Sequence, residues 1–388
     1  MLHQHVHTTR TGFLLATLLI CSGAFAQTDM FFSSYLVKDD NIYKVQSEYQ
    51  EWINTSTLYF GQTFPIGAFK VQGFYSADVS LFGNNSEQNN FSQQFGAVAR
   101  WNKEKYALDI KADGHFRRND AQYIYYNTNS FNFSTRLRYT PALTKSYTFG
   151  INASQYQYRE FSDIDNFTYR LYGKYQQYFQ SRMSISGEVG IGVKNYLNQT
   201  VINYFGNTGF GGPRRGLRIS EEPVKSALFS VSGNVAKSIS AKTGMNMSFG
   251  GQWFIGDPIQ AYSETDGIYY FTENDLYDDP YSFQGPFVSL NLTRQFGVGF
   301  KGKVSAKFQK KYYSGTPALD ENGDLLGYTR EDSRQEYSLL LSKSFNTGWR
   351  FPKTINLNFN FMFRNNPSND PYYDFNDTLG LIGFSISK

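Results

Sequence analysis

Hydrophobic and polar residues alternate along most of this chain, and this period of two constrains the fold more than any other feature. From Ile355 the apolar positions are Leu357, Phe359, Phe361 and Phe363, and asparagine fills most positions between them. The same alternation recurs over residues 106–112, 167–179, 183–193, 288–292 and 337–341. Successive side chains of a strand point to opposite faces of a sheet, so strict alternation predicts one face in an apolar medium and the other in a polar one. No window of comparable length has the period of an amphipathic helix.

The breaks between these segments are alternately short and long. The short ones lie near Pro65–Gly67, Asn102–Glu104, Pro141–Lys145, Gln180–Arg182, Ser238–Lys242, Gly297–Gly299 and Asn346–Lys353. The long polar ones are Gly83–Asn90, Arg118–Asn127, Glu160–Asn166, Leu197–Val224, Gly256–Pro280, Ser314–Asp332 and Asn365–Thr378. An antiparallel meander that closes in a membrane has this rhythm, with tight periplasmic turns and longer outer loops. Strands of about 10 to 14 residues also suit a tilted crossing of the hydrocarbon layer.

Counting the spans predicts the number of strands. Fifteen spans run from Trp52 to Lys388. A single-chain bacterial barrel has an even number of strands, with both termini on the periplasmic side, so one more strand must precede Trp52. Met30 to Val37 is the candidate, with Phe31, Ser33 and Tyr35 in alternation. The prediction is therefore an all-β protein, a closed antiparallel transmembrane barrel of sixteen strands, with fourteen as the alternative. Closure also removes the exposed edges of long strands.

Composition excludes several other classes of protein. The chain is 18% aromatic with a mean hydropathy of −0.48, and it has no apolar run of the about 20 residues that a transmembrane helix needs. Disordered chains are poor in aromatic residues. A formal net charge of +4 over 388 residues argues against a nucleic-acid partner. A secreted β-sandwich or β-solenoid is the alternative, but sandwich strands are usually shorter and no repeated motif indicates a solenoid.

The first 26 residues have the pattern of a cleaved signal peptide. Arg10 provides the positive flank, Gly12–Ile20 is mostly apolar, and Ala24–Ala26 places small residues before Gln27. A single transmembrane anchor is the alternative, but the apolar run is short for one. The predicted organisation is a signal peptide at residues 1–26 and one barrel domain at residues 27–388. Cys21, the only cysteine, leaves with the signal, which excludes disulfides, a Cys nucleophile and a Cys-based metal site in the mature chain.

Aromatic residues gather at the predicted strand ends, as they do in the interfacial girdles of membrane barrels. They are Tyr59, Phe60, Phe82, Trp101, Tyr139, Tyr178, Phe179, Trp253, Phe254, Tyr312, Tyr313, Phe345 and Trp349. With the signal peptide, the turn rhythm and the final span Leu379–Lys388, the chain resembles bacterial outer-membrane β-barrel proteins. In particular, it resembles the porin-like, Tyr- and Asn-rich barrels of Bacteroidota-like bacteria. The resemblance implies an outer-membrane location and contact with outer-membrane lipid. Fold alone does not choose among channels, transporters, adhesins and enzymes.

If the apolar register faces lipid, the opposite register faces the lumen and its charges can be read from the sequence. Fifteen basic residues are predicted to line it: Lys70, Arg100, Lys111, Arg117, Arg136, Arg138, Arg170, Lys174, Lys194, Lys301, Lys303, Lys307, Lys311, Arg334 and Arg364. The acidic residues of this register are Asp78, Asp109, Asp113, Glu188 and Glu336. Rings of Lys and Arg favour anions in a pore, and sixteen strands leave room for an aqueous channel. The sequence therefore predicts a porin-like passage for small polar or anionic solutes.

Two alternatives remain open. The interior charges could fill the lumen in solvated or paired form, so that nothing passes. The protein could also be a non-conducting surface barrel that binds a partner or a glycan through its long aromatic and acidic loops, above all Gly256–Pro280. The acidic loop residues are Glu264, Asp266, Glu273, Asp275, Asp278, Asp279, Asp320, Glu321 and Asp324. Solute identity and oligomeric state are beyond the sequence.

The sequence gives little support to an enzyme, a metal site or a cofactor. His115 is the only histidine of the predicted mature chain, and no nucleophile motif accompanies it. It is interpreted as a lumenal residue in a polar network with Asp113 and Arg117. Asp320, Asn322, Asp324 and Glu331 have the spacing of a calcium loop, but Leu325 stands where such loops need glycine. We therefore predict no catalytic residue, no metal site and no cofactor.

Overall fold

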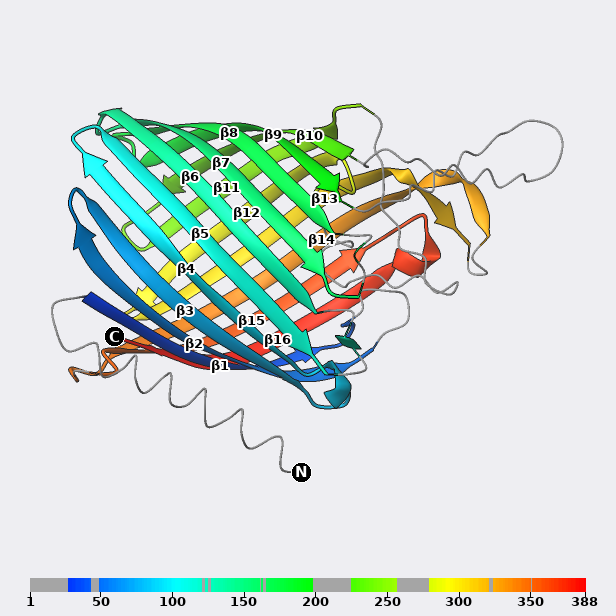
Figure 1. Cartoon of the computed structure of the whole chain (residues 1–388), viewed down its shortest axis with the longest axis horizontal. Helices are drawn as coiled ribbons and strands as arrows, with labels where there is room; N and C mark the ends of the chain where they lie inside the picture. Colours follow the sequence, from blue (N-terminus) through cyan, green and yellow to red (C-terminus); the bar gives the residue numbers. More distant parts are fainter. Residues whose placement is uncertain are drawn as a thin grey trace.

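The computed structural model describes residues 27–42, 49–120, 123–124, 127–160, 162, 165–197, 225–256, 279–320, 324–349 and 351–388. Within these residues, sixteen antiparallel strands follow one another around a closed barrel (Figure 1), which confirms the predicted fold class and strand count. The strands are β1 (Gln27–Asp39), β2 (Glu51–Ile66), β3 (Phe69–Phe82), β4 (Asn90–Lys103), β5 (Tyr106–Asn119), β6 (Thr128–Ala142), β7 (Lys145–Tyr158), β8 (Asn166–Phe179), β9 (Met183–Tyr196), β10 (Lys225–Ser238), β11 (Thr243–Phe254), β12 (Gly285–Gly297), β13 (Phe300–Leu319), β14 (Leu325–Asn346), β15 (Thr354–Asn366) and β16 (Phe375–Ser387). The predicted signal peptide lies outside the described residues.

The first and last strands close the barrel. β1 pairs with β2 from Gln27↔Thr63 to Asp39↔Glu51, and with β16 from Phe31↔Ser387 to Asp39↔Leu379. The additional strand that the even-number rule requires is therefore present, and it is longer than the predicted Met30–Val37. Its alternating residues Phe31, Ser33 and Tyr35 face the interior.

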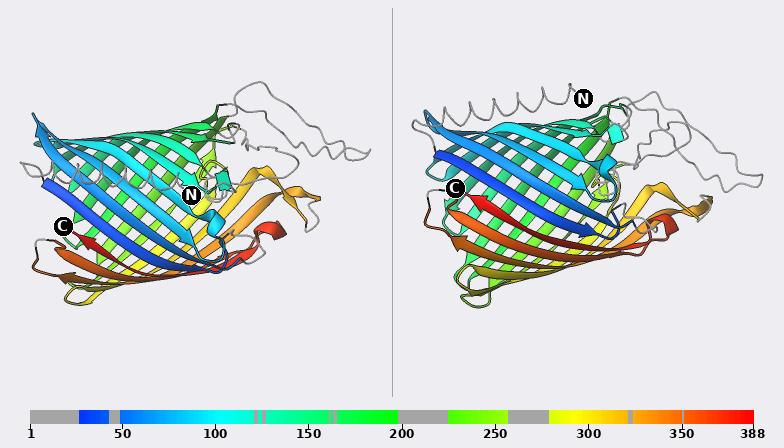
Figure 2. Two further views of the ribbon diagram at one scale, coloured as in Figure 1. Left: turned by 60° about the horizontal axis from the view of Figure 1, so that its bottom comes forward. Right: turned by 90° about the horizontal axis from the view of Figure 1, so that it is seen from below.

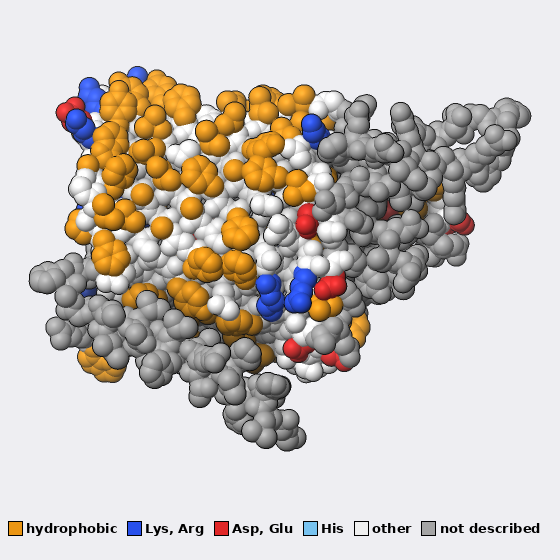
Figure 3. All heavy atoms as spheres, in the orientation of Figure 1, with side chains coloured by type: hydrophobic (Ala, Val, Ile, Leu, Met, Phe, Trp, Pro, Cys, Tyr) orange, Lys and Arg blue, Asp and Glu red, His pale blue; other side chains and the backbone are white. Residues whose placement is uncertain are grey.

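The wall of the barrel has an apolar outer face. Phe149 on β7, Leu171 on β8, Val304 on β13 and Ile382 on β16 have between 55% and 61% of their surface exposed. Figure 3 shows hydrophobic side chains spread over the visible side of the wall, with the charged ones gathered toward its two ends. An exposed apolar surface of this extent is stable only against another apolar phase. The band matches the lipid-facing side of a transmembrane barrel.

The two ends of the barrel differ in their connections. One end carries the tight turns, including the one at Gly67, and it is called the short-turn end. β16 also finishes there (Figure 2), where the backbone N–H of Lys353 donates to the carbonyl of Ser387 at 2.9 Å. The opposite end, called the long-loop end, holds the 3₁₀ turns η2 (Ser86–Gln88) and η5 (Pro371–Tyr373). The predicted loop regions at residues 198–224 and 257–278 lie outside the described residues.

One predicted loop proves to be mostly strand. Ser314–Asp332 was expected to be a polar connection, but β13 runs to Leu319 and β14 begins at Leu325. Tyr313 pairs with Arg330, and the register shifts twice beyond it before Leu319 pairs with Leu325. These two strands extend past the rest of the barrel at the long-loop end (Figure 1). Glu331 is part of β14 opposite Tyr312, so the spacing that resembled a calcium loop does not form one continuous loop.

Gly383 lies where β16 meets β1, and the structure predicts that the seam requires glycine there. A Cβ atom at this position would overlap the ring of Tyr35 and the carbonyl oxygen of Ser34. At Gly380, in the same strand, a Cβ would meet nothing within 4 Å. We expect Gly383→Ala to lower the fraction of folded barrel, whereas Gly380→Ala should fold normally. Heat-modifiable mobility in gel electrophoresis measures this fraction, and equal folding of the two variants would contradict closure through this seam.

Candidate functional site

The strand register places all fifteen predicted basic residues on the face opposite the apolar one. They come from β3 (Lys70), β4 (Arg100), β5 (Lys111, Arg117), β6 (Arg136, Arg138), β8 (Arg170, Lys174), β9 (Lys194), β13 (Lys301, Lys303, Lys307, Lys311), β14 (Arg334) and β15 (Arg364). Cross-strand partners share a face, so pairs such as Lys70↔Arg100 and Asp109↔Arg136 define the interior. Most of these residues fall into three groups along the barrel axis. Outside the groups, Arg117 donates to Asn119 at 3.1 Å, and Lys307 pairs with Glu336 across β13 and β14. The contact of all these residues with a passing solute stays a prediction.

The first group lies near the short-turn end and is called the basic belt: Lys70, Arg100, Arg136, Arg138, Lys174, Lys301 and Lys303. Arg136 donates to Asp109 at 2.5 and 3.1 Å. Within the described residues, the other six have no carboxylate oxygen within 4.0 Å, the limit for an ion pair. Part of the belt lines a cavity of about 590 Å³, in which Arg136, Arg138 and Lys174 are accompanied by Glu188. Positive charge therefore outweighs negative charge at this end of the interior.

The second group lies at mid-height, and its charges are neutralised locally. Lys111 contacts Asp113 at 2.7 Å, and this carboxylate also accepts hydrogen bonds from Gln94 and Asn132. Arg170 contacts Glu188 at 2.8 Å on the neighbouring strand. These pairs line or adjoin a second cavity of about 620 Å³, which shares Asn152 and Arg170 with the cavity of the belt.

The third group lies near the long-loop end and is buried. Lys194, Lys311 and Arg334 face inward but have 6%, 1% and 3% of their surface exposed. Lys194 forms an ion pair with Asp279, and Lys311 lies 4.4 Å from the ring centroid of Phe283. These side chains are packed against neighbours, in contrast to the cations of the belt, which are exposed or half-buried.

Other inward charges near this end are also compensated. Arg364 on β15 is 3.2 Å from Asp377 and 3.3 Å from Glu336. Asp39, Asp40 and Asp377 can bring carboxylate oxygens within 4.8 Å of one another. Because Arg364 neutralises one of these carboxylates, the group is best described as part of an ion-pair network of the barrel wall.

A short segment just before β12 lies against the inner face of β9, β10 and β11, and sequence reasoning missed it. The segment Asp279–Gln284, called the strap, is held by the ion pair of Asp279 with Lys194. Ser226 donates to the carbonyl of Tyr281 at 3.1 Å, and Gln252 donates to the carbonyl of Phe283 at 2.8 Å. Gln252 alternates with apolar neighbours in β11 and could have been identified as inward-facing. No local pattern predicts that Tyr281 returns to the wall, because this contact joins residues far apart in the chain.

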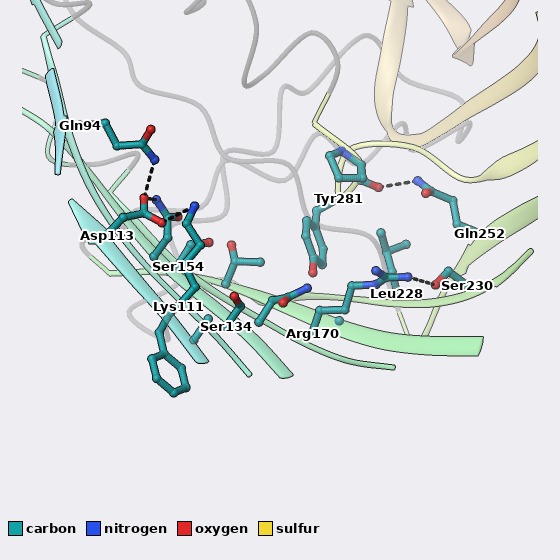
Figure 4. A pocket seen from close by; sticks show the side chains of 17 residues that line it. Gln94, Lys111, Asp113, Ser134, Ser154, Arg170, Leu228, Ser230, Gln252 and Tyr281 are labelled. Atoms are coloured by element: carbon teal, nitrogen blue, oxygen red, sulfur yellow. Dashed lines mark hydrogen bonds and ion pairs between the residues drawn. The ribbon is translucent and has the colours of Figure 1, made fainter. Parts of the chain in front are cut away.

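The strap places Tyr281 over the mid-height cavity. Figure 4 shows its side chain directed toward the wall near Arg170. A Cβ atom at Gly192 would overlap the phenol oxygen, so only glycine leaves room for the ring there. Burial raises the pKa of Tyr281 to about 12, an effect that Asp279 reinforces. The phenol is therefore a neutral hydrogen-bonding group at physiological pH.

His115 takes the position that the sequence predicted for it. It pairs with Gln94 on β4 and with Ser130 on β6, on the inward face. Asp113, two residues earlier on the same face, is engaged by Lys111, Gln94 and Asn132. The interpretation of His115 as a lumenal network residue stays a prediction. The acidic residues Glu264, Asp266, Glu273, Asp275, Asp278 and Glu321 lie outside the described residues.

No protein-family model and no curated protein matches this sequence. Among the described residues, no helix is long and apolar enough to span a membrane.

Solved structures do match the fold. Pseudomonas aeruginosa OprD matches with a TM-score of 0.51 at 11% identity, over 94% of this chain and 95% of its own. Acinetobacter baumannii OccAB1 matches with a TM-score of 0.52 at 10% identity, over 93% and 96%. These neighbours are outer-membrane porins, and the likeness at this identity concerns the fold: this chain has the closed sixteen-stranded barrel of a bacterial outer-membrane β-barrel protein.

Proposed function

We propose that this chain is an integral outer-membrane channel of the porin kind, which passes small polar or anionic solutes. The basic belt carries this proposal. Its six cations without a described carboxylate partner come from β3, β4, β6, β8 and β13, so they approach the passage from several sides. In a water-filled passage with low-dielectric walls, such charges raise the local concentration of anions and lower that of cations. The fold of the outer-membrane porins supports the location, and the predicted signal peptide is part of the same proposal.

The cavities of the interior favour an open passage for solutes over an interior that side chains fill completely. Two cavities of about 590 and 620 Å³ lie next to each other in the interior, and Asn152 and Arg170 line both. A sixteen-stranded barrel is also wide enough for an aqueous channel. Within this proposal the belt at the short-turn end selects by charge, and the strap narrows the passage above it.

Reversal potentials across a planar bilayer test the proposal. In a KCl gradient, the purified protein should produce discrete conductance steps. The reversal potential of this current should lie closer to the equilibrium potential of chloride than to that of potassium. Chloride preference should weaken as ionic strength rises, because the Debye length shortens from ~10 Å at 0.1 M to ~3 Å at 1 M. A barrel that binds a partner or a glycan without conducting would leave the salt and sugar permeability of liposomes unchanged. That result, or a preference for potassium, would contradict the proposal.

A further inference from the structure

The mid-height cavity has a lining unlike that of the basic belt. It is formed by inward residues of β4 to β11 on one side and by the strap on the other (Figure 4). Its volume of about 620 Å³ lies within the range of small-molecule sites. Amide and hydroxyl side chains make up most of its polar lining: Gln94, Asn132, Ser134, Asn152, Ser154, Thr168, Ser230, Gln252 and Tyr281.

The charged side chains that line this cavity already have ion-pair and hydrogen-bond partners within the protein. The side chain of Asp113 is only 2% exposed and accepts from Lys111 at 2.7 Å, Gln94 at 2.9 Å and Asn132 at 3.0 Å. Arg170 contacts Glu188 at 2.8 Å and donates to Ser230 at 3.4 Å. A charged ligand would have to compete with a partner that is already in place. The lining therefore favours a neutral ligand.

Three neutral side chains remain available to such a ligand. Ser134, Asn152 and Ser154 form no side-chain hydrogen bond within the described part of the chain, although all three line the cavity. Ser134 pairs with Asn152 across β6 and β7, and Ser154 lies two residues from Asn152 on the same face. Cross-strand neighbours lie about 5 Å apart and same-face neighbours about 7 Å apart, which is the scale of a sugar ring. The wall thus presents a rigid grid of donors and acceptors.

Tyr281 supplies an aromatic group near this grid. The strap holds its backbone through Ser226 and Gln252, and Gly192 leaves room for its hydroxyl. The ring is half-buried, and its phenol stays neutral because burial raises its pKa to about 12. An aromatic ring can cover the C–H face of a sugar, and surrounding amides and hydroxyls can bond to its hydroxyl groups.

We propose that the mid-height cavity is a binding site for a small neutral sugar, a mono- or disaccharide, held by Ser134, Asn152, Ser154 and Tyr281. This inference rests on the proposed function, since it gives the passage a class of solute. In this view the basic belt selects ions by their charge, and the mid-height cavity binds polyhydroxylated solutes. Sugar hydroxyls both donate and accept, so they can match this mixture of side chains, whereas a compact anion offers acceptors only.

The test combines calorimetry with single-channel recording on the full-length mature protein, purified in an amine-oxide detergent because sugar-based detergents would compete. Maltose should give saturable heat and should reduce the ion current in a concentration-dependent way. Asn152→Val combined with Tyr281→Leu should weaken maltose binding by about thirtyfold, as expected when two contacts of about 1 kcal/mol each are lost. Asn360→Val, an inward substitution on β15 outside the cavity, is the matched control and should leave maltose binding unchanged. Heat-modifiable mobility verifies that each variant is folded.

The outcomes separate this inference from the proposed function. Anion-selective current without saturable maltose binding overturns the sugar site alone. Saturable maltose heat without any conductance supports the site and overturns the passage. An equal block by potassium acetate would make the cavity an anion site and would overturn the inference, as would maltose affinity that is unchanged in the double variant.

Discussion

Replacing Arg100, Arg138 and Lys174 together by glutamate is expected to convert the channel from chloride-preferring to potassium-preferring. These three side chains belong to the basic belt, and no described carboxylate lies within ion-pair distance of them. Each substitution changes the local charge by two units, so reversing these three charges changes the charge around one level of the passage by six units. Because the surrounding wall has a low dielectric constant, charges inside it act on ions more strongly than charges in bulk water. The reversal potential in a KCl gradient should change sign at low salt.

A matched triple variant separates lumenal charge from charge at the same end of the barrel. Lys237, Arg294 and Lys343 also lie near the short-turn end, but the register places them on the outer face, opposite Met245, Thr243 and Leu357. Substituting these three by glutamate should change the reversal potential far less. If both triple variants shift selectivity equally, the preference arises from the general charge of the mouth, and the belt has no special role.

The second large effect is expected at Asp332. On β14, Arg330 donates from Nε to Asp332 at 2.9 Å and from Nη2 at 2.6 Å, and Asp332 is completely buried. The guanidinium also lies 4.1 Å from the ring centroid of Tyr313 and 3.3 Å from that of Tyr373. Asp332→Asn removes the negative partner and leaves a buried arginine without its compensating charge. Breaking a buried pair in this way costs about 3 to 5 kcal/mol.

Urea unfolding in detergent or liposomes, followed by tryptophan fluorescence, measures this change in the free energy of unfolding. Asp324→Asn is the control, because Asp324 is exposed just before β14. We expect a marked fall in the unfolding midpoint for Asp332→Asn and little change for Asp324→Asn. Loss of less than about 1 kcal/mol at Asp332, the usual effect of a surface ion pair, would show that this cluster does not stabilise the long-loop end.

The barrel itself was predictable because its cause is local. A lipid-facing sheet imposes alternation on each strand, as in Ile355–Phe363, and closure requires an even count, which predicted a strand before Trp52. The same alternation along each strand predicts that the basic residues face the interior. Their ion pairs could not be predicted, because Arg170 meets Glu188 through a register that sequence spacing alone does not determine.

Two other features depend on contacts between distant segments. Gly315, Pro317 and Gly323 are turn-forming residues, so the sequence indicated a loop where β13 and β14 continue. Tyr313 and Arg330 hold these strands together through buried contacts that also involve Phe283 and Tyr373. The position of Tyr281 depends likewise on Lys194, far earlier in the chain, and on the absence of a side chain at Gly192.

Cysteine accessibility tests the central claim that one face of the sheet lines a water-filled interior while the other contacts lipid. The only native cysteine, Cys21, lies within the predicted signal peptide, so single cysteines can be introduced into a mature chain without background. Asn358→Cys and Asn360→Cys on β15 should react with a charged, membrane-impermeant thiol reagent in intact outer membranes. Leu357→Cys and Phe359→Cys, their outward neighbours, should stay unreacted. Equal reaction at all four positions, or reaction at the outward pair alone, would contradict the account.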